Sequence, residues 1–240
     1  MQLKTPGIVL CNVKYNDKYS LVHIYTQQAG RVVYMISRPK GKGGKLSMNI
    51  FSPLNILDIE AEHLPTRDIQ RIREARNLLP YQSIPSDFNK TSLLFFLSEF
   101  LSKVLKDAND CHLIYEFISE SMKILEITER STANFHIVFM LQLIHFLGFY
   151  PNLENYAEGD YFDLLAGEFS PTTPFHRHFI SRNDSQALSR LARITYTNMH
   201  HFAFNRNERK TIILHILEYY KLHVQNFADL KSLDILHELF

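Results

Sequence analysis

The sequence predicts an α+β protein with more than one domain, in which a small five-stranded β-barrel comes first and an all-helical region follows. Three observations support this prediction. Apolar and polar residues alternate over the first 60 residues, the period becomes helical after Pro85, and an irregular segment typical of a β-hairpin interrupts the helices. The expected domains are residues 1–80 and residues 81–240, with the irregular hairpin segment at residues 149–181.

Five strands are expected in the first domain, four of them from a clear pattern at residues 7–13, 20–26, 30–38 and 54–60. Residues 68–77 are ambiguous, because Ile69, Ile72 and Ala75 suit a helix whereas residues 70–74 suit an edge strand with polar outward faces. A closed five-stranded barrel needs this segment as its last strand. We therefore expect a strand there.

The helical region is expected to hold six helices and one hairpin. The helices are predicted at residues 89–105, 109–127, 134–147, 184–194, 208–224 and 230–240, and the hairpin at residues 161–170 with its turn at Ala166 and Gly167. From Phe135 to Leu147 ten of thirteen residues are apolar, which indicates a central helix wrapped by others. Gly148 and Pro151 then end that helix.

Composition excludes several classes of protein. The chain has 240 residues, 26 Lys and Arg against 25 Asp and Glu, and 45% hydrophobic residues, so wholesale disorder is excluded. The longest apolar runs are five residues, far below the roughly 18 needed to span a bilayer, and no signal peptide is visible. Cys11 and Cys111 are the only cysteines, which argues against a disulfide framework or a thiolate metal cage. A cytoplasmic protein without a membrane partner is expected.

The near-neutral total charge conceals a basic segment. Between residues 14 and 45 the chain carries seven basic residues and one acid, Asp17. Such a surface attracts polyanions, because bound phosphates release their condensed counterions; a solvated loop without a partner is the alternative. The candidate DNA-binding residues are Lys14, Lys18, Arg31, Tyr34, Arg38, Lys40, Lys42 and Lys45. Tyr34 is included as a candidate platform for base stacking, as is Tyr25, although barrel packing is the more common role of such a ring.

A second basic group lies on the predicted helices of the C-terminal half, with acids interspersed. Its members are Arg190, Arg193, Arg206, Arg209, Lys210 and Lys221. Three interpretations stay open for this group: solvated polar faces, a second DNA contact, or a clamp for an acidic peptide tail whose apolar side chain fills a neighbouring groove.

No catalytic constellation is present, so we expect a protein that is not an enzyme. The Gly41–Ser47 segment lacks the spacing of a phosphate loop, and neither a nucleophile elbow nor a His-Glu-x-x-His motif occurs. His176 and His178 lack ligands at metal spacing, which favours surface histidines. His136 and His145 are expected in the core of the helical region.

The order of several segments along the whole chain resembles the RecO family of bacterial DNA repair proteins. The segments are Gly7–Leu10, Lys18–Thr26, Gly30–Val32, a Lys/Gly loop, Phe51–Leu54, Arg71–Ala75, Phe139–Pro151, Tyr219–His223 and Leu230–Leu236. No single segment is diagnostic; their collinearity carries the resemblance.

The resemblance implies an OB-type barrel followed by an all-α domain, in a mediator that makes and breaks no bond. Members of the family bind single- and double-stranded DNA and anneal complementary strands. They act with RecR to displace single-stranded DNA-binding protein, whose acidic C-terminal tail is a further expected contact, so that RecA can load. Association with the nucleoid is expected in consequence. The rival hypothesis is a protein–protein adaptor whose barrel no longer binds nucleic acid.

The chain departs from the family pattern at the zinc site. Many members carry four cysteines after the Gly-Phe-Tyr-Pro segment, whereas here Tyr156 stands near the first position and residues 152–240 contain no cysteine. Neither zinc nor another cofactor is therefore expected. The hairpin is expected to be held by Tyr161, Phe162, Phe169 and Phe175 instead.

Overall fold

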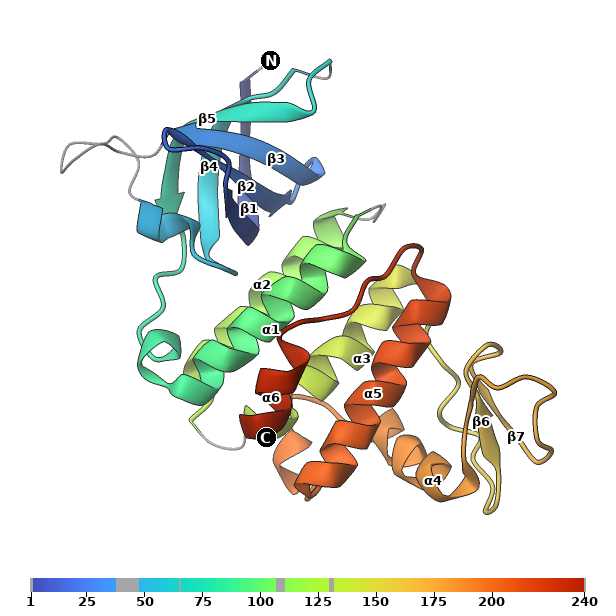
Figure 1. Cartoon of the computed structure of the whole chain (residues 1–240). Helices are drawn as coiled ribbons and strands as arrows, with labels where there is room; N and C mark the ends of the chain where they lie inside the picture. The colour runs from blue at the N-terminus through green and yellow to red at the C-terminus, as the bar shows by residue number, and fades with distance from the viewer. Residues whose placement is uncertain (1, 38–47, 65, 107–110, 130–131, 240) are drawn as a thin grey trace. The chain divides into compact units, whose positions relative to one another are not determined.

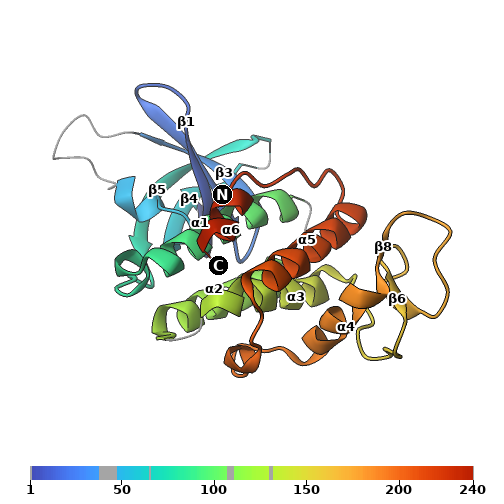
Figure 2. The same cartoon turned by 60° about the horizontal axis from the view of Figure 1, so that its bottom comes forward.

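The computed structural model describes residues 2–37, 48–64, 66–106, 111–129 and 132–239 (Figures 1 and 2). Its strands are β1 (Gln2–Lys14), β2 (Tyr19–Thr26), β3 (Gly30–Ser37), β4 (Ile56–Glu62), β5 (Ile69–Asn77), β6 (Tyr161–Asp163), β7 (Glu168–Ser170) and β8 (Phe179–Ile180). Its α-helices are α1 (Phe88–Val104), α2 (Cys111–Ile127), α3 (Phe135–Leu147), α4 (Arg182–Arg190), α5 (Arg206–His223) and α6 (Leu233–Leu239). Five short 3₁₀ helices lie at Met48–Phe51, Ile84–Ser86, Thr132–Asn134, Leu191–Arg193 and Met199–His201.

The chain forms two compact units. The first comprises residues 1–127 and 230–236, and the second comprises residues 128–229 and 237–240. Helices α1 and α2 therefore belong to the same compact unit as the barrel, and the expected division at residue 80 falls within that unit. The α+β prediction, a β-barrel followed by a helical region with a small hairpin, is confirmed.

The barrel is closed by five strands in the order β1-β2-β3-β5-β4. All neighbours are antiparallel except β3 and β5, which pair in parallel with Tyr34 opposite Gln70 and Met35 opposite Arg71. The segment at residues 68–77 is thus a strand, as expected. It is a strand because β3 and β4 each offer it a row of backbone partners, which a helix there would leave unpaired.

Strand β1 serves two neighbours and changes partner at Gly7. Its first half pairs with β4 and its second half with β2, and Gly7 lies opposite both Leu57 and Thr26. A Cβ atom on Gly7 would lie 2.6 Å from Cγ2 of Ile24. The strand therefore needs glycine here, because the barrel interior leaves no room for a side chain.

The barrel core is built from the inward side chains of alternating residues. Val9, Val22, Ile24, Val32, Tyr34, Ile36, Phe51, Leu57, Ile59 and Ala61 form one buried cluster. Residues of opposite parity on β2 and β3 consequently point away from the core.

Helices α1 and α2 are joined to the barrel and to the segment that leaves it. Ser98 on α1 donates a hydrogen bond to the Leu10 carbonyl of β1. The Glu126 carboxylate, at the end of α2, accepts hydrogen bonds from the backbone N–H groups of Gln82, Ser83 and Ile84. The segment between the barrel and α1 is thereby fastened to the end of α2.

The second unit is organised around α3, whose side chains from Phe135 to Ile144 are almost all buried. Gly148 ends this helix in the left-handed conformation, with φ of 82°, as expected. Helix α5 runs alongside α3 in both views (Figures 1 and 2), and Tyr220 on α5 donates a hydrogen bond of 2.7 Å to the Met140 carbonyl. His136 is fully buried, whereas His145 is exposed and stacks on Tyr150, so the core position expected for His145 was wrong.

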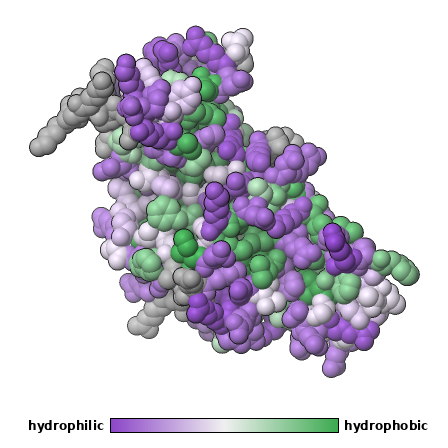
Figure 3. All heavy atoms as spheres, viewed as in Figure 1, coloured by the Kyte–Doolittle hydropathy of each residue, from purple (hydrophilic) through white to green (hydrophobic). Residues whose placement is uncertain are grey.

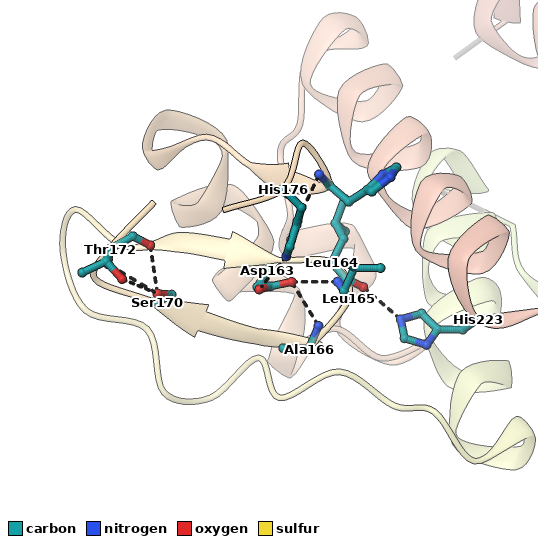
Figure 4. Close-up of polar contacts among 9 residues, drawn as sticks. Asp163, Leu164, Leu165, Ala166, Ser170, Thr172, His176 and His223 are labelled. Carbon is teal, nitrogen blue, oxygen red and sulfur yellow. Dashed lines mark hydrogen bonds and ion pairs between the residues drawn. The ribbon is translucent and has the colours of Figure 1, made fainter. Parts of the chain in front are cut away.

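The hairpin segment forms a three-stranded sheet in the order β7-β6-β8, with its turn at Ala166 and Gly167 as expected. Asp163 stabilises the turn: it accepts hydrogen bonds from the backbone N–H groups of Leu165 and Ala166 and lies 3.1 Å from Nε2 of His176 (Figure 4). Burial opposes ionisation of Asp163, but these hydrogen bonds outweigh it, so the pKa of the carboxyl lies below its ordinary value.

Aromatic packing supports this sheet, with one correction to the expected set. Phe169 packs edge-on against Phe162 and against Tyr156, and Tyr161 packs edge-on against Phe179. Phe175 is fully exposed and holds nothing, so that expectation was wrong. The ring that completes the cluster is Phe179, because β8 pairs with β6.

Candidate nucleic-acid interface

The predicted DNA-binding residues fall in three different settings. Lys14 ends β1 and Lys18 lies in the turn between β1 and β2, and both side chains are exposed. Arg31 and Tyr34 lie within β3. Arg38, Lys40, Lys42 and Lys45 lie outside the described residues; they belong to the sequence between Ser37, which ends β3, and Met48.

Arg31 does not share a surface with Lys14 and Lys18. Its Nη1 donates a hydrogen bond of 2.7 Å to the Ser102 carbonyl on α1, and its Nη2 lies 3.2 Å from Nδ1 of His23. Arg31 lies near the start of β3, whereas the β1–β2 turn lies beside the end of β3, about 20 Å away at about 3.3 Å per residue. The prediction placed Arg31 on the basic surface; in the structure it joins the barrel to α1.

His23 is affected by this arrangement. Burial and the neighbouring guanidinium of Arg31 lower the pKa of His23, since both disfavour the imidazolium. A neutral His23 is able to accept a hydrogen bond from Arg31, which supports the structural interpretation of this pair.

Tyr34 is not a stacking platform, because its ring is fully buried in the barrel core. Tyr25 is 1% exposed and is likewise inaccessible to a base. Burial raises the pKa of Tyr34 to about 12, and its hydroxyl has no hydrogen-bond partner among the described residues. The ring packs in the barrel core. Its buried hydroxyl lowers the stability of the fold, because it has no hydrogen-bond partner among the described residues.

Replacement of Tyr34 by Phe is therefore expected to raise the free energy of unfolding by about 1 kcal/mol, since it removes a buried polar group without a partner. Urea denaturation of the two proteins measures the difference. DNA affinity should stay unchanged. A fall in the free energy of unfolding of Y34F would contradict the absence of a partner for this hydroxyl within the described part of the chain.

The structure brings together a set of exposed side chains on the outer face of the barrel that the sequence interpretation missed. Tyr15 and Tyr19 flank the β1–β2 turn and are 61% and 37% exposed. In the next row across the sheet, Val13 lies opposite Leu21 and Leu21 opposite Met35. Val13 is 52% exposed, and Leu21 and Met35 are partly exposed.

Arg71 continues this row onto β5. It lies opposite Met35, and its side chain is exposed. Arg73 and Arg76, further along the same strand, pair instead with the carboxylates of Glu62 and Asp58 on β4. We define the outer face of the barrel as Val13, Tyr15, Tyr19, Leu21, Met35 and Arg71, with Lys14 and Lys18 at its rim. Figure 3 shows hydrophilic residues interspersed with hydrophobic patches over the side of the barrel visible in that view.

A signal for part of this set was present in the sequence. Tyr34 is in phase with Val32 and Ile36, whereas Tyr19 is in phase with Leu21 and out of phase with Val22. The period of two therefore assigns Tyr34 to the core side of its strand and Tyr19 to the other side.

Three members of the second basic group form hydrogen bonds or an ion pair within the second unit. Arg209 donates hydrogen bonds to the side-chain oxygen of Asn134 and to the Phe204 carbonyl, and burial lowers its pKa. Arg206 donates to the His237 carbonyl, and Lys221 lies 2.6 Å from the Asp229 carboxylate. Lys210 is exposed on α5.

Arg190 and Arg193 are different, because both line a cavity of about 760 Å³. They come from the end of α4 and from the following 3₁₀ turn, and apolar walls are supplied by Leu153, Tyr156, Ala192 and Phe202. Glu154 also lines the cavity. The Arg190 guanidinium lies 5.4 Å from the centre of the Phe204 ring, a cation–π distance. A pocket of this size with two cations and apolar walls suits a peptide that carries both carboxylates and an apolar side chain.

The histidines of the hairpin segment have carboxylate partners that the sequence did not reveal. His176 lies 3.1 Å from Asp163, and His178 lies 3.3 Å from Glu218 on α5. Across the ranges that the structure describes, no three His, Cys, Asp or Glu side chains are grouped so as to hold a metal ion. Over the same ranges, no helix is long and apolar enough to cross a membrane.

The chain begins with a closed five-stranded barrel that has an exposed outer face, and a helical region follows the barrel in the sequence. These features define the class of an OB-type barrel protein with a helical C-terminal part. The family model for the recombination protein O N-terminal domain matches residues 1–81, and the model for its C-terminal domain matches residues 85–234. The chain belongs to the RecO family.

Proteins named DNA repair protein RecO are similar to this chain over the full length of both. The one from Azobacteroides pseudotrichonymphae is 44% identical over 240 residues, that from Bacteroides fragilis 39% over 241, and that from Porphyromonas gingivalis 36% over 244. The resemblance inferred from the order of segments is thus confirmed, and it supports a role in repair and recombination without indicating an enzymatic activity.

Proposed function

We propose that this protein is a recombination mediator that binds single- and double-stranded DNA without sequence specificity through the outer face of its barrel. It anneals complementary strands and, with RecR, helps RecA to load onto DNA coated by single-stranded DNA-binding protein. The observation that carries the proposal is the exposed outer face with Lys14, Lys18 and Arg71 around it, in a chain of the RecO family. Such a protein acts in the cytoplasm, at the nucleoid.

The physical basis is neutralisation of phosphates. Contacts to phosphates carry no base information, so binding through them is independent of sequence. A surface that neutralises two strands at once lowers their mutual repulsion, and this favours annealing without any bond being made or broken. Arg38, Lys40, Lys42 and Lys45 follow β3 in the sequence and complete the proposed basic set; Arg31 and Tyr34 are no longer part of it.

Salt dependence of binding tests this function. With about five to seven phosphate contacts, the slope of log affinity against log salt on single-stranded DNA should be roughly −3 to −5. Substitution of Lys40, Lys42 and Lys45 by Ala should weaken binding and reduce the magnitude of the slope by about 2, since each lost contact accounts for about 0.7. Fluorescence anisotropy with a labelled oligonucleotide measures both quantities.

Lys123→Ala is the control, because Lys123 is an exposed lysine on α2 that pairs with Glu120 and is not part of the proposed basic set. It should leave affinity and slope unchanged. A wild-type slope near −1, or a triple variant with wild-type affinity, would favour the adaptor hypothesis, in which the barrel does not bind nucleic acid.

A second contact is favoured by the cavity at Arg190 and Arg193. We assign it to the acidic C-terminal tail of single-stranded DNA-binding protein, whose carboxylates would pair with the two guanidinium groups while an apolar side chain enters between Tyr156 and Phe202. The remaining arginines of the group serve the fold instead. The hairpin follows the cavity-lining residues 153–156 in the sequence. We propose that it needs no zinc, because aromatic packing and the Asp163 contacts support it.

A further inference from the structure

We infer that Tyr15 and Tyr19 form a stacking platform for the bases of single-stranded DNA, so that the barrel holds a single strand by its bases as well as by its phosphates. This inference rests on the proposed function and deepens it. It assigns to two residues of the β1–β2 turn the ability to distinguish a single strand from a duplex.

Tyr15 and Tyr19 are neighbours across the hairpin. The backbone N–H of Tyr15 donates a hydrogen bond of 3.1 Å to the Tyr19 carbonyl, directly beyond the last strand pair, Lys14 with Ser20. Residues opposite one another across an antiparallel hairpin project their side chains to the same side, with Cβ atoms about 5 Å apart. Tyr15 and Tyr19 therefore project two exposed rings to the same side of the hairpin.

The turn that carries the rings is ordered by its own hydrogen bonds. The side-chain oxygen of Asn16 accepts hydrogen bonds from the backbone N–H groups of Lys18 and Tyr19, at 2.9 and 2.8 Å. The Asn16 N–H in turn donates to the Tyr19 carbonyl. A platform on an ordered turn loses little conformational freedom when a base stacks on it.

Charge around the rings suits a polyanion. Lys14 and Lys18 each directly precede one of the two tyrosines, and both are exposed. Asp17 is the one acid of the turn, and it lies 2.8 Å from Lys14. An exposed pair of this kind adds little stability, so a phosphate can replace the carboxylate as the partner of Lys14. The chemistry is that of a sequence-tolerant single-strand site, with aromatic rings beside cations.

The rest of the outer face extends the platform. Val13, Leu21 and Met35 form the adjacent row, and Arg71 closes it on β5. Exposed apolar side chains in such a row have no partner within the barrel core, whose members have the opposite parity. A base has a flat apolar face that covers these side chains and the rings, whereas the bases of a duplex are already stacked on one another.

The experiment separates bases from phosphates with an abasic probe. Labelled oligo(dT), an oligonucleotide of equal length with abasic sugars, and a duplex are titrated with the full chain. Stacking at two rings predicts that oligo(dT) binds at least about 10-fold more tightly than the abasic strand. The Y15A/Y19A variant should lose most of this preference for oligo(dT) over the abasic strand, with its salt slope and its affinity for the duplex unchanged.

The Y15F/Y19F variant is the matched control, because it keeps both rings and should keep the preference for bases. Equal affinity of the wild type for oligo(dT) and the abasic strand would overturn the inference while leaving phosphate binding intact. Wild-type affinity of Y15A/Y19A for oligo(dT) would also overturn it. If the wild type bound none of the three probes, the proposed function itself would fail, and the inference with it.

Discussion

Substitution of both Arg190 and Arg193 by Glu is expected to lower the affinity for an acidic peptide by about 100-fold, because two cations of the cavity become like charges of the ligand. The peptide should carry several aspartates and one phenylalanine, so that carboxylates and an apolar ring are present together. Anisotropy of the labelled peptide measures Kd for the wild type and the variant.

Two comparisons make this result specific to the cavity. Lys210→Glu changes the charge at an exposed residue of α5 that does not line the cavity, and it should leave Kd unchanged. Replacing the peptide's phenylalanine by alanine should weaken wild-type binding, since the walls at Tyr156 and Phe202 would lose their contact. Equal affinities of wild type and double variant would exclude the cavity as the tail site.

Asn134→Ala is expected to lower the free energy of unfolding by about 3 kcal/mol, since it leaves several buried polar groups unpaired. Asn134 is 4% exposed, and its side-chain amide donates hydrogen bonds to the carbonyls of Met199 and Phe202. Its side-chain oxygen accepts a hydrogen bond from Nε of Arg209. The substitution removes three contacts at once, and urea denaturation measures the loss.

The same substitution bears on the tail cavity, because Phe202 is both a partner of Asn134 and a wall of that cavity. Asn134→Ala should therefore also weaken binding of the acidic peptide. Asn134→Asp is the paired variant: it keeps an oxygen for Arg209 but replaces both donated hydrogen bonds by repulsion between its second carboxylate oxygen and the Met199 and Phe202 carbonyls, so it too should lower the free energy of unfolding. A loss below about 0.5 kcal/mol in Asn134→Ala would show that the network contributes little.

The class of fold and the family were accessible from the sequence because they depend on local pattern and order. Alternation at a period of two predicted the strands, the apolar length from Phe135 to Leu147 predicted the central helix, and Gly148 marked its end. Each of these signals is a property of neighbouring residues. The hairpin turn at Gly167 belongs to the same kind, since a left-handed φ of 71° favours glycine wherever it occurs.

The roles of individual residues depended on partners far away in the chain. Arg31 is the clearest case: it reads as a free cation in the sequence, but its partner is a carbonyl 71 residues further on. Arg209 and Asn134 are 75 residues apart, and the Asp163 partner of His176 lies 13 residues earlier, at the end of β6. A sequence shows which residues are charged. Only the tertiary structure shows which of them form ion pairs or hydrogen bonds with residues elsewhere in the chain.

The sequence by itself determined that this chain is a barrel followed by helices, that it belongs among the RecO proteins, and that its basic residues gather near the N-terminus. Only the tertiary structure decided which tyrosines on the outward side are accessible: Tyr19 is exposed beside the β1–β2 turn, whereas Tyr25, on the same side of β2, is buried. It also decided that Arg190 and Arg193 share a cavity with Tyr156 and Phe202. The physical reason is that periodicity defines the two faces of a strand or helix, but exposure depends on what packs against each face.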